Sequence, residues 1–364
     1  MRLLLAAMMV CVAIGLPHAQ LSTDAPELPK VAAVTRAFVP GGTYEWREAQ
    51  SHALLTTIWY PADATARTQP HSLGPEGRPW FVFGSWAADA PFRTGRVPLV
   101  LLSHGTGGSS TMLAWLGVTL AAQGYVVAAV NHPGNNSLEE YTAQGFLLWW
   151  ERARDISAVI DGIMKDSTLA SHVDQRRIGA AGFSLGGYTM IALAGGRTDP
   201  ERLRTYCRQK VSNCTDPDEF PGLFAKWDQL SRTDPAFRRI SEQAPQRSYR
   251  DPRIRSVLAI APALGQALVP ASLTNIKIPV ALVAGDKDDV VPAGDNAVFL
   301  HSMIGASRLT LLPNVAHYTF LATCTTEGQK MRPALCGDVE GVNRQTVHDA
   351  VARSATDYFR ETLR

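Results

Sequence analysis

The amino-acid sequence predicts a doubly wound α/β fold with a mainly parallel sheet and an inserted helical cap. Short stretches made almost wholly of Val, Leu, Ile and Ala recur along the chain, and such stretches are typical of strands buried on both faces of a parallel sheet. Segments with helical periodicity alternate with them, as expected when helices connect parallel strands. A chain of 364 residues that is 46% hydrophobic can bury a large core, so we expect one domain over residues 20–364.

The first predicted strand, residues 53–61, is β-branched and aromatic and ends at a proline, which indicates an antiparallel strand of a mixed sheet. A loop rich in Pro, Gly and Ser is expected over residues 67–96. The later predicted elements are, in order, strand 97–103, helix 112–124, strand 125–130, helix 149–164, strand 177–181, helix 187–194, strands 256–261, 279–285 and 308–312, and helix 345–363.

Residues 197–255 interrupt this alternation. The segment holds several prolines, two cysteines and aromatic residues scattered through helical pieces. We interpret it as a cap inserted over the active-site face of the sheet. A solvated helical excursion that contacts no substrate is the alternative.

The N-terminus carries Arg2 and then an apolar run that ends near residues 17–19. This pattern predicts a cleaved secretory signal over residues 1–19, and hence export to the periplasm or beyond the cell. Because the run is short for a membrane span, we expect no stable membrane insertion after cleavage; an uncleaved anchor is the alternative.

Four cysteines follow the predicted signal, and their order suggests two local disulfides, Cys207 with Cys214 and Cys324 with Cys336. Free buried thiols are the alternative. No paired C-x-x-C motifs occur, so a zinc site is not expected. The net charge is only +2 and no basic stripe is present, so nucleic acid is not an expected partner.

The run Gly182-Phe183-Ser184-Leu185-Gly186 lies between a predicted strand and a helix of small residues, which is the setting of a nucleophile elbow. The two glycines remove Cβ atoms that would crowd such a sharp turn. Ser184 is therefore the candidate nucleophile, with a role as a simple helix N-cap as the alternative. The Leu185 N–H, at the start of the helix, is a candidate oxyanion donor.

A serine nucleophile needs a histidine base and a carboxylate that orients it, and in a fold with this elbow the acid and then the histidine follow the serine along the chain. The loop after strand 279–285 offers Asp286, Asp288 and Asp289. Among the histidines that follow, His317 comes after a predicted strand and a short turn, whereas His301 and His348 lie in helical stretches. We therefore expect His317 to be the base.

Six segments resemble the α/β-hydrolase superfamily, and within it the secreted dienelactone-hydrolase-like proteins related to platelet-activating factor acetylhydrolases. The segments are TIWYPA from Thr57, PLVLLSHGTGG from Pro98, AAQGYVVAAVNHPG from Ala121, GFSLGGY from Gly182, ALVAGDKDDVVP from Ala281 and NVAHYTFL from Asn314.

The resemblance implies hydrolysis of a small-molecule ester without metal or organic cofactor. It assigns the triad acid to Asp288, with Asp286 as the fallback and Asp289 facing solvent. It also assigns the second oxyanion donor to the Thr106 N–H and leaves His104 to brace the loop.

One difference narrows the substrate, because dienelactone hydrolases carry cysteine at the elbow where this chain has Ser184. A short acyl ester therefore fits better than a dienelactone. Four aromatic residues could line a pocket for a longer or aromatic group, or serve only as core packing: Trp115, Phe146, Trp149 and Trp150. We expect a serine esterase; a lipase, thioesterase or peptidase on the same triad, or a binding module without catalysis, are the alternatives.

Overall fold

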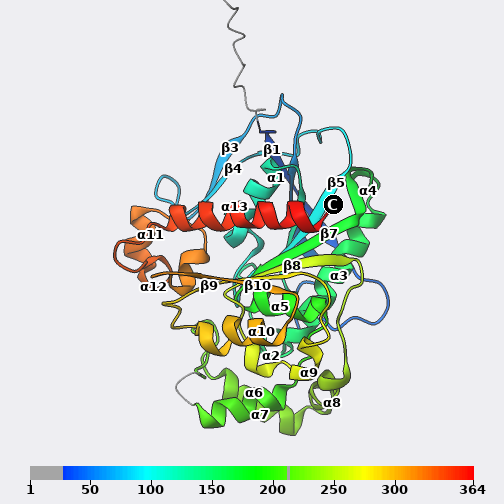
Figure 1. Ribbon diagram of the computed structural model, residues 1–364, viewed down its shortest axis with the longest axis vertical. Coiled ribbons are helices and arrows are strands. Elements are labelled where there is room, and N and C mark those ends of the chain that lie inside the picture. The colour runs from blue at the N-terminus through cyan, green and yellow to red at the C-terminus, as the bar shows by residue number, and fades with distance from the viewer. Residues whose placement is uncertain (1–27, 211–213) are drawn as a thin grey trace, which may run out of the picture.

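An eleven-stranded mixed sheet forms the centre of the computed structural model, which describes residues 28–210 and 214–364 (Figure 1). The predicted secretory signal, residues 1–19, lies outside the described residues. The strands are β1 (Val31–Phe38), β2 (Leu54–Pro61), β3 (Gln69–Leu73), β4 (Phe81–Ala88), β5 (Val97–Ser103), β6 (Val126–Val130), β7 (Val173–Phe183), β8 (Ile254–Ile260), β9 (Val280–Gly285), β10 (Ser307–Leu312) and β11 (Thr323–Cys324).

The strand order is β10-β9-β8-β7-β5-β6-β2-β1-β4-β11, with β3 paired to β4. The six strands from β10 to β6 are mutually parallel, and β2 joins them antiparallel to β6, as the sequence predicted. In the central pair, Ser103 of β5 lies opposite Gly182 of β7. The carboxyl ends of these two strands therefore meet at one edge of the sheet, where ligands bind in open α/β folds.

Helices cover both faces of the sheet, so the doubly wound α/β class is confirmed. Helices α1 and α13 pack on one face, and α3, α5 and α10 pack on the other. The helices are α1 (Ala114–Ala122), α2 (Ala143–Leu147), α3 (Arg152–Lys165), α4 (Ser167–His172), α5 (Leu185–Ala194), α6 (Pro200–Gln209), α7 (Leu223–Thr233), α8 (Pro235–Gln243), α9 (Pro270–Leu273), α10 (Ala297–Met303), α11 (Thr326–Met331), α12 (Pro333–Cys336) and α13 (Arg344–Thr362).

Periodicity explains how the chain fills both layers. In β5, Leu99 and Leu101 contact the layer of α3 and α5, whereas the alternate residues contact the layer of α1 and α13. Helix α3 buries Ile156, Val159, Ile160 and Ile163, which share one face at helical spacing. Helix α5 is buried along its whole length, as expected for a helix made of small and apolar residues.

The prediction of a loop over residues 67–96 is wrong, because this segment forms strands β3 and β4. Strand β3 is mostly exposed and carries no apolar alternation, and β4 is interrupted by Gly84, so neither has a clear strand pattern. Two predicted helices also begin later than expected. Residues 110–113 and 149–151 form short 3-10 helices before α1 and α3 start.

We call residues 197–255 the cap segment, after the role predicted for them; their described part, residues 197–210 and 214–255, contains helices α6, α7 and α8 at the lower end of the molecule in Figure 1. Asp199 and Asp234 cap α6 and α8, each followed by a proline at the first helical position. Both predicted disulfides are formed, Cys207–Cys214 and Cys324–Cys336.

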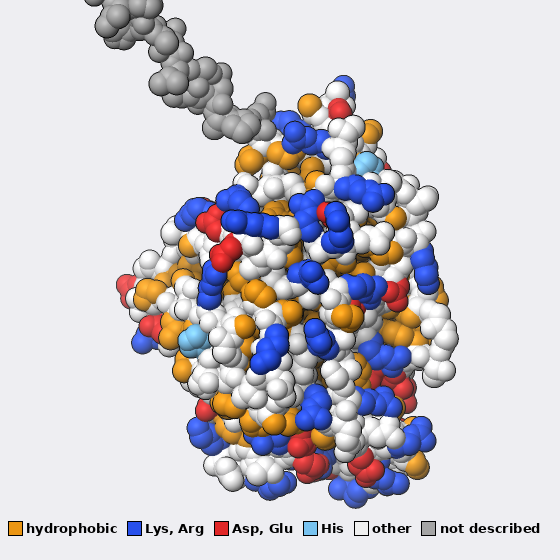
Figure 2. All heavy atoms as spheres, turned by 45° about the vertical axis from the view of Figure 1, so that its right-hand side comes forward, with side chains coloured by type: hydrophobic (Ala, Val, Ile, Leu, Met, Phe, Trp, Pro, Cys, Tyr) orange, Lys and Arg blue, Asp and Glu red, His pale blue; other side chains and the backbone are white. Residues whose placement is uncertain are grey.

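The surface carries no single large field of one charge on the face in Figure 2, where Lys and Arg side chains are spread among neutral and hydrophobic ones. In the part of the chain that the structure describes, no helix combines the length and the apolarity that crossing a membrane requires.

Candidate active site

Ser184 occupies the sharp turn between β7 and α5 at the carboxyl edge of the sheet. Its backbone has φ +54° and ψ −117°, a conformation that a residue with a Cβ rarely adopts. Surrounding hydrogen bonds hold this strained turn: the Ser184 N–H donates to Ile260 O at 2.9 Å, and its carbonyl accepts from the Ala263 N–H at 3.0 Å. Strain of this kind persists only where the surrounding fold supports it, and it occurs mainly at functional sites.

The glycines around Ser184 are required by close backbone packing. A Cβ on Gly186 would lie 2.0 Å from Ser103 O, and a Cβ on Gly182 would lie 2.3 Å from Gly186 O. No side chain fits at either position, so β5, β7 and α5 approach each other more closely than other residues would allow.

The structure brings Ser184, His317 and Asp288 together, although they are far apart in the sequence. His317 Nε2 lies 3.0 Å from Ser184 Oγ, and His317 Nδ1 lies 2.7 Å from Asp288 Oδ2. All three side chains are buried. With Nδ1–H donating to the Asp288 carboxylate, Nε2 is left as the acceptor for the serine hydroxyl, which is the tautomer that a general base needs.

The other acid and base candidates lie elsewhere. Asp286 accepts a hydrogen bond from the Asn314 N–H at 2.7 Å and braces the next loop, and Asp289 is exposed. His301 is exposed on α10 and contacts Ser307 Oγ at 2.9 Å. His348 is buried on α13, stacked on Trp115.

Both candidate oxyanion donors line the cavity next to Ser184. Leu185 is the first residue of α5, so its N–H has no partner within the helix. Thr106 lies in the loop after β5, and among the described residues its N–H has no protein acceptor. Two unpaired N–H groups beside a buried hydroxyl can stabilise negative charge that develops on a carbonyl oxygen.

A cavity of about 780 Å³ opens onto these groups, and residues of the cap segment form part of its wall. Its lining is largely apolar and aromatic and includes Phe224 and Trp227 of α7. The acidic lining residues are Asp216, Asp218, Glu219 and Asp289. Burial raises the pKa of Glu219 above its usual value. Among the described residues, no group of His, Cys, Asp or Glu is arranged to hold a metal ion.

Of the four aromatic residues expected either to line a pocket or to pack in the core, two line the cavity and two do not. Phe146 and Trp149 line the cavity. Trp150 is wholly buried in the core, and Trp115 donates from Nε1 to Phe320 O at 3.0 Å, behind the turn that carries His317. The latter two therefore serve packing.

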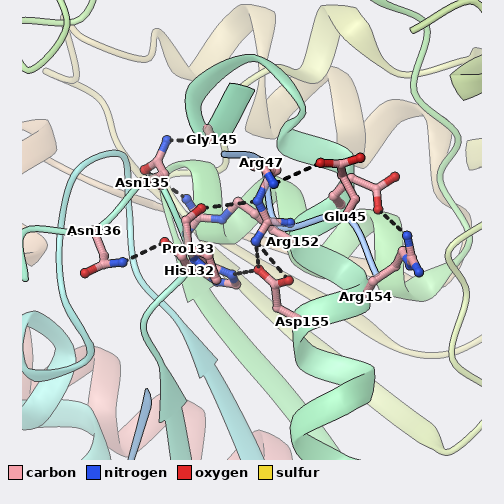
Figure 3. A network of polar contacts seen from close by, with 12 residues as sticks. Glu45, Arg47, His132, Pro133, Asn135, Asn136, Gly145, Arg152, Arg154 and Asp155 are labelled. Carbon is pink, nitrogen blue, oxygen red and sulfur yellow. Dashed lines mark hydrogen bonds and ion pairs between the residues drawn. The ribbon is translucent and has the colours of Figure 1, made fainter. Parts of the chain in front are cut away.

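Sequence reasoning missed a buried polar network beneath the loop of Thr106. In Figure 3, Arg47, His132 and Arg152 gather around Asp155, and Asn135 lies beside them. Arg152 and Asp155 lie on α3 and are buried. Charged residues in a helix normally indicate its solvent-facing side, so the sequence alone does not predict that these two are buried. The segment around His132 carried the family resemblance, and its Asn-His pair after a buried strand was the available hint.

Known proteins with esterase and acetylhydrolase names resemble parts of the chain. A family model described as platelet-activating factor acetylhydrolase, isoform II, matches residues 84–145. Cutinase 2 of Thermobifida cellulosilytica is 30% identical over 146 residues, which are 38% of this chain and 52% of that protein. A platelet-activating factor acetylhydrolase of Canis lupus familiaris is 36% identical over 77 residues, which are 18% of this chain and 17% of that protein. The chain spans about half the length of the cutinases that it matches.

A solved structure, a ferulic acid esterase from Streptomyces cinnamoneus, matches nearly the whole chain. It covers 94% of this chain and 92% of its own, with a TM-score of 0.63 and 19% identity. At that identity the match concerns the fold alone. Together with the mainly parallel sheet flanked by helices, this match shows that the chain has the α/β-hydrolase fold.

Proposed function

We propose that this α/β-hydrolase is a serine esterase that cleaves carboxylic esters through an acyl-enzyme, with Ser184 as nucleophile, His317 as base and Asp288 as the orienting acid. The observation that carries the proposal is the continuous hydrogen-bonded chain from Ser184 Oγ through His317 to Asp288, of which Ser184 and His317 line a cavity. Relatives named as cutinase and acetylhydrolase support the ester as substrate.

In the first half of the reaction, Ser184 Oγ attacks the ester carbonyl carbon while His317 Nε2 takes the hydroxyl proton. Negative charge develops on the carbonyl oxygen, which accepts hydrogen bonds from the Leu185 and Thr106 N–H groups. The imidazolium is stabilised by the Asp288 carboxylate. When the tetrahedral intermediate collapses, the His317 proton passes to the leaving alcohol and the acyl group stays on Ser184.

Deacylation repeats these steps with water. His317 removes a proton from the water molecule as the latter attacks the acyl carbon, and it returns that proton to Ser184 Oγ when the acid leaves. Ester and water are consumed and alcohol and acid are released, and each proton taken up by His317 is returned within the same half of the reaction. The aromatic lining favours an apolar acyl group. The carboxylates in the lining disfavour an acyl group that carries a negative charge.

We also propose that residues 197–255 act as a cap and that residues 1–19 are removed on export. Phe224 and Trp227 of this segment lie in the cavity wall, which supports a role in substrate selection. The two disulfides fit an oxidising compartment. N-terminal sequencing of the exported protein tests the second proposal, with Gln20 expected as the first residue.

The test of the esterase is hydrolysis of p-nitrophenyl acetate, butyrate and palmitate by wild type and Ser184→Ala. We expect kcat to fall by a factor on the order of 10⁴ or more. Ser256→Ala is the matched control, because Ser256 is a buried serine on β8 that contacts Thr362. Equal activity of the Ser184→Ala and Ser256→Ala variants, both folded, would refute the proposed nucleophile.

A further inference from the structure

The loop that carries Thr106 is held by buried side chains on either side of that residue. We call residues 104–108 the oxyanion loop. Asn135 Oδ1 accepts from the Gly107 N–H at 2.8 Å, and Tyr141 OH donates to Gly107 O at 2.9 Å. The His104 ring hydrogen-bonds Gly105 O at 2.6 Å through Nδ1, and the Arg152 guanidinium donates to His104 O. Backbone groups before and after Thr106 are thus fixed, while the Thr106 N–H itself stays free.

Arg152, which holds the start of the oxyanion loop, is an unusual arginine because it is completely buried and forms no ion pair with a carboxylate among the described residues. Asp155, whose charge acts on Arg152, is occupied by three other groups. It accepts from Arg47 at 2.8 and 3.0 Å and from His132 Nδ1 at 2.6 Å (Figure 3), and also from the Tyr44 hydroxyl. Burial lowers the pKa of Arg152 to about 9, so the guanidinium is charged at neutral pH.

The neighbouring histidines do not add charge. Burial, and secondly the charge of Arg152, lower the pKa of His104 and His132 well below the usual value, so both are neutral at pH 7. The cluster therefore holds two guanidinium groups against the Asp155 carboxylate. Burying a charge without an ionic partner costs free energy unless the group is hydrogen-bonded. The Arg152 guanidinium donates to Ser103 Oγ, His104 O and Asn135 Oδ1, at the base of the oxyanion loop.

We infer that Arg152 and Asn135 are positioning residues that hold the oxyanion loop so that the Thr106 N–H points at the reacting carbonyl oxygen. The inference rests on the proposed esterase function. Arg152 fixes the start of the loop at His104, and Asn135 joins Arg152 to the far side of Thr106 at Gly107. A donor that is already in place costs no reorganisation when charge develops, and a misplacement of about 1 Å can cost a factor on the order of 100 in rate.

The test compares Asn135→Ala with Asn135→Asp and with Asn131→Ala. Asn135→Asp keeps the acceptor for Gly107 and Arg152, replaces the donor Nδ2 that contacts Gly145 O at 3.3 Å by an oxygen, and adds a negative charge beside Arg152. Asn131 is the matched control, since it is equally buried but accepts from the Ser110 N–H, beyond the loop. Measured are kcat and KM for p-nitrophenyl butyrate, inhibition by butylboronic acid, and amide hydrogen exchange of residues 104–108.

We expect Asn135→Ala to lower kcat on the order of 100-fold while KM changes less than about threefold. Boronate affinity should fall by a similar factor, because the boronate becomes a tetrahedral anion when it accepts an electron pair from Ser184 Oγ. Loop amides should exchange faster. Asn135→Asp should recover at least about tenfold of the lost rate, and Asn131→Ala should stay within about threefold of wild type.

The inference is overturned if the wild type is active and Asn135→Ala, folded, loses no more kcat than Asn131→Ala, or if the loss appears in KM alone. Failure of the proposed function looks different, because the wild type itself would then hydrolyse no ester and bind no boronate. In that case unchanged exchange of residues 104–108 in Asn135→Ala would also show that Asn135 does not hold the loop.

Discussion

At the scale of single residues, the site depends on positions where no side chain can be added. Gly186 lies inside helix α5, where alanine normally stabilises a helix by about 1 kcal/mol relative to glycine. Here a Cβ would meet Ser103 O at 2.0 Å, so β5 and α5 would have to separate. We therefore expect alanine at position 186 to destabilise the folded protein, whereas alanine usually stabilises a helix relative to glycine.

We predict that Gly186→Ala lowers the free energy of unfolding by about 3 kcal/mol, as an overpacked core position does. Urea unfolding followed by circular dichroism measures it. Gly294→Ala is the control, because Gly294 also lies in a short helix and a Cβ there meets nothing within 4 Å. The packing argument fails if the two variants are equally stable.

His348 gives a pH prediction at the same scale. Burial and the charge of Arg344 lower its pKa from 6.5 to about 4 in the folded protein. Between pH 6.5 and 4, the unfolded chain therefore binds a proton at this position that the folded protein does not. Stability falls as the pH falls through this window, by roughly 3 kcal/mol in all for this group.

The variant His348→Gln keeps a donor for Thr319 O, which His348 Nε2 contacts at 2.9 Å, but cannot be protonated. We expect its unfolding free energy, relative to wild type, to rise by most of that amount between pH 7 and pH 4.5. Urea midpoints at the two pH values measure the difference. An identical pH slope in both proteins would mean that His348 takes up its proton at the same pH folded and unfolded.

The local sequence around each residue explains which parts of the site could be predicted and which could not. Ser184 and His317 each follow a strand in the chain order that the fold requires, so they could be selected without coordinates. Asn135 and Arg152 could not, because only three-dimensional packing shows that the charged start of α3 is buried beneath β5.

At the scale of elements, periodic signals predicted the parallel core and failed at its edge. Strands β5, β6, β8 and β9 carry runs of buried apolar residues. Strand β3 pairs antiparallel with β4, and β4 in turn pairs in parallel with β1 and antiparallel with β11. Such pairing is a property of distant segments, and a local pattern of Pro, Gly and exposed residues cannot reveal it.

The two disulfides should differ in function because they join different elements. Cys324–Cys336 adjoins Arg344, which donates to Ala322 O at 3.1 Å and Leu335 O at 2.9 Å, next to the turn of His317. Cys207–Cys214 closes the end of α6 in the cap segment.

We predict that the double variant Cys324→Ser/Cys336→Ser loses about 2–4 kcal/mol of stability and that its kcat falls, since the turn bearing the base is less firmly held. The double variant Cys207→Ser/Cys214→Ser should keep the kcat for p-nitrophenyl acetate and change the KM values of longer esters. Kinetics with the acetate and butyrate esters and thermal unfolding test both. Equal kcat losses in the two double variants would contradict this division of roles.

At the scale of the whole molecule, substrate selection should arise where the cap segment meets the sheet domain. Trp227 of α7 is buried against Trp149, with ring centroids 5.5 Å apart, and Arg204 lies over it at 4.3 Å. Both tryptophans line the cavity, so this contact limits the space available to the acyl group.

Shortening Trp227 should therefore enlarge the cavity and shift the preference toward longer acyl chains. For Trp227→Phe, a smaller ring in a buried site, we predict that the ratio of kcat/KM for p-nitrophenyl octanoate to that for the acetate rises about tenfold, since an added methylene in an apolar pocket contributes about 1–3 kcal/mol. Phe237→Leu is the control, because Phe237 is equally buried in the cap segment but lies outside the cavity lining. If Phe237→Leu produces the same shift, loosening of the whole segment sets the preference and the Trp227 ring does not. If only Trp227→Phe shifts the ratio, the wall of the cavity selects the acyl chain directly.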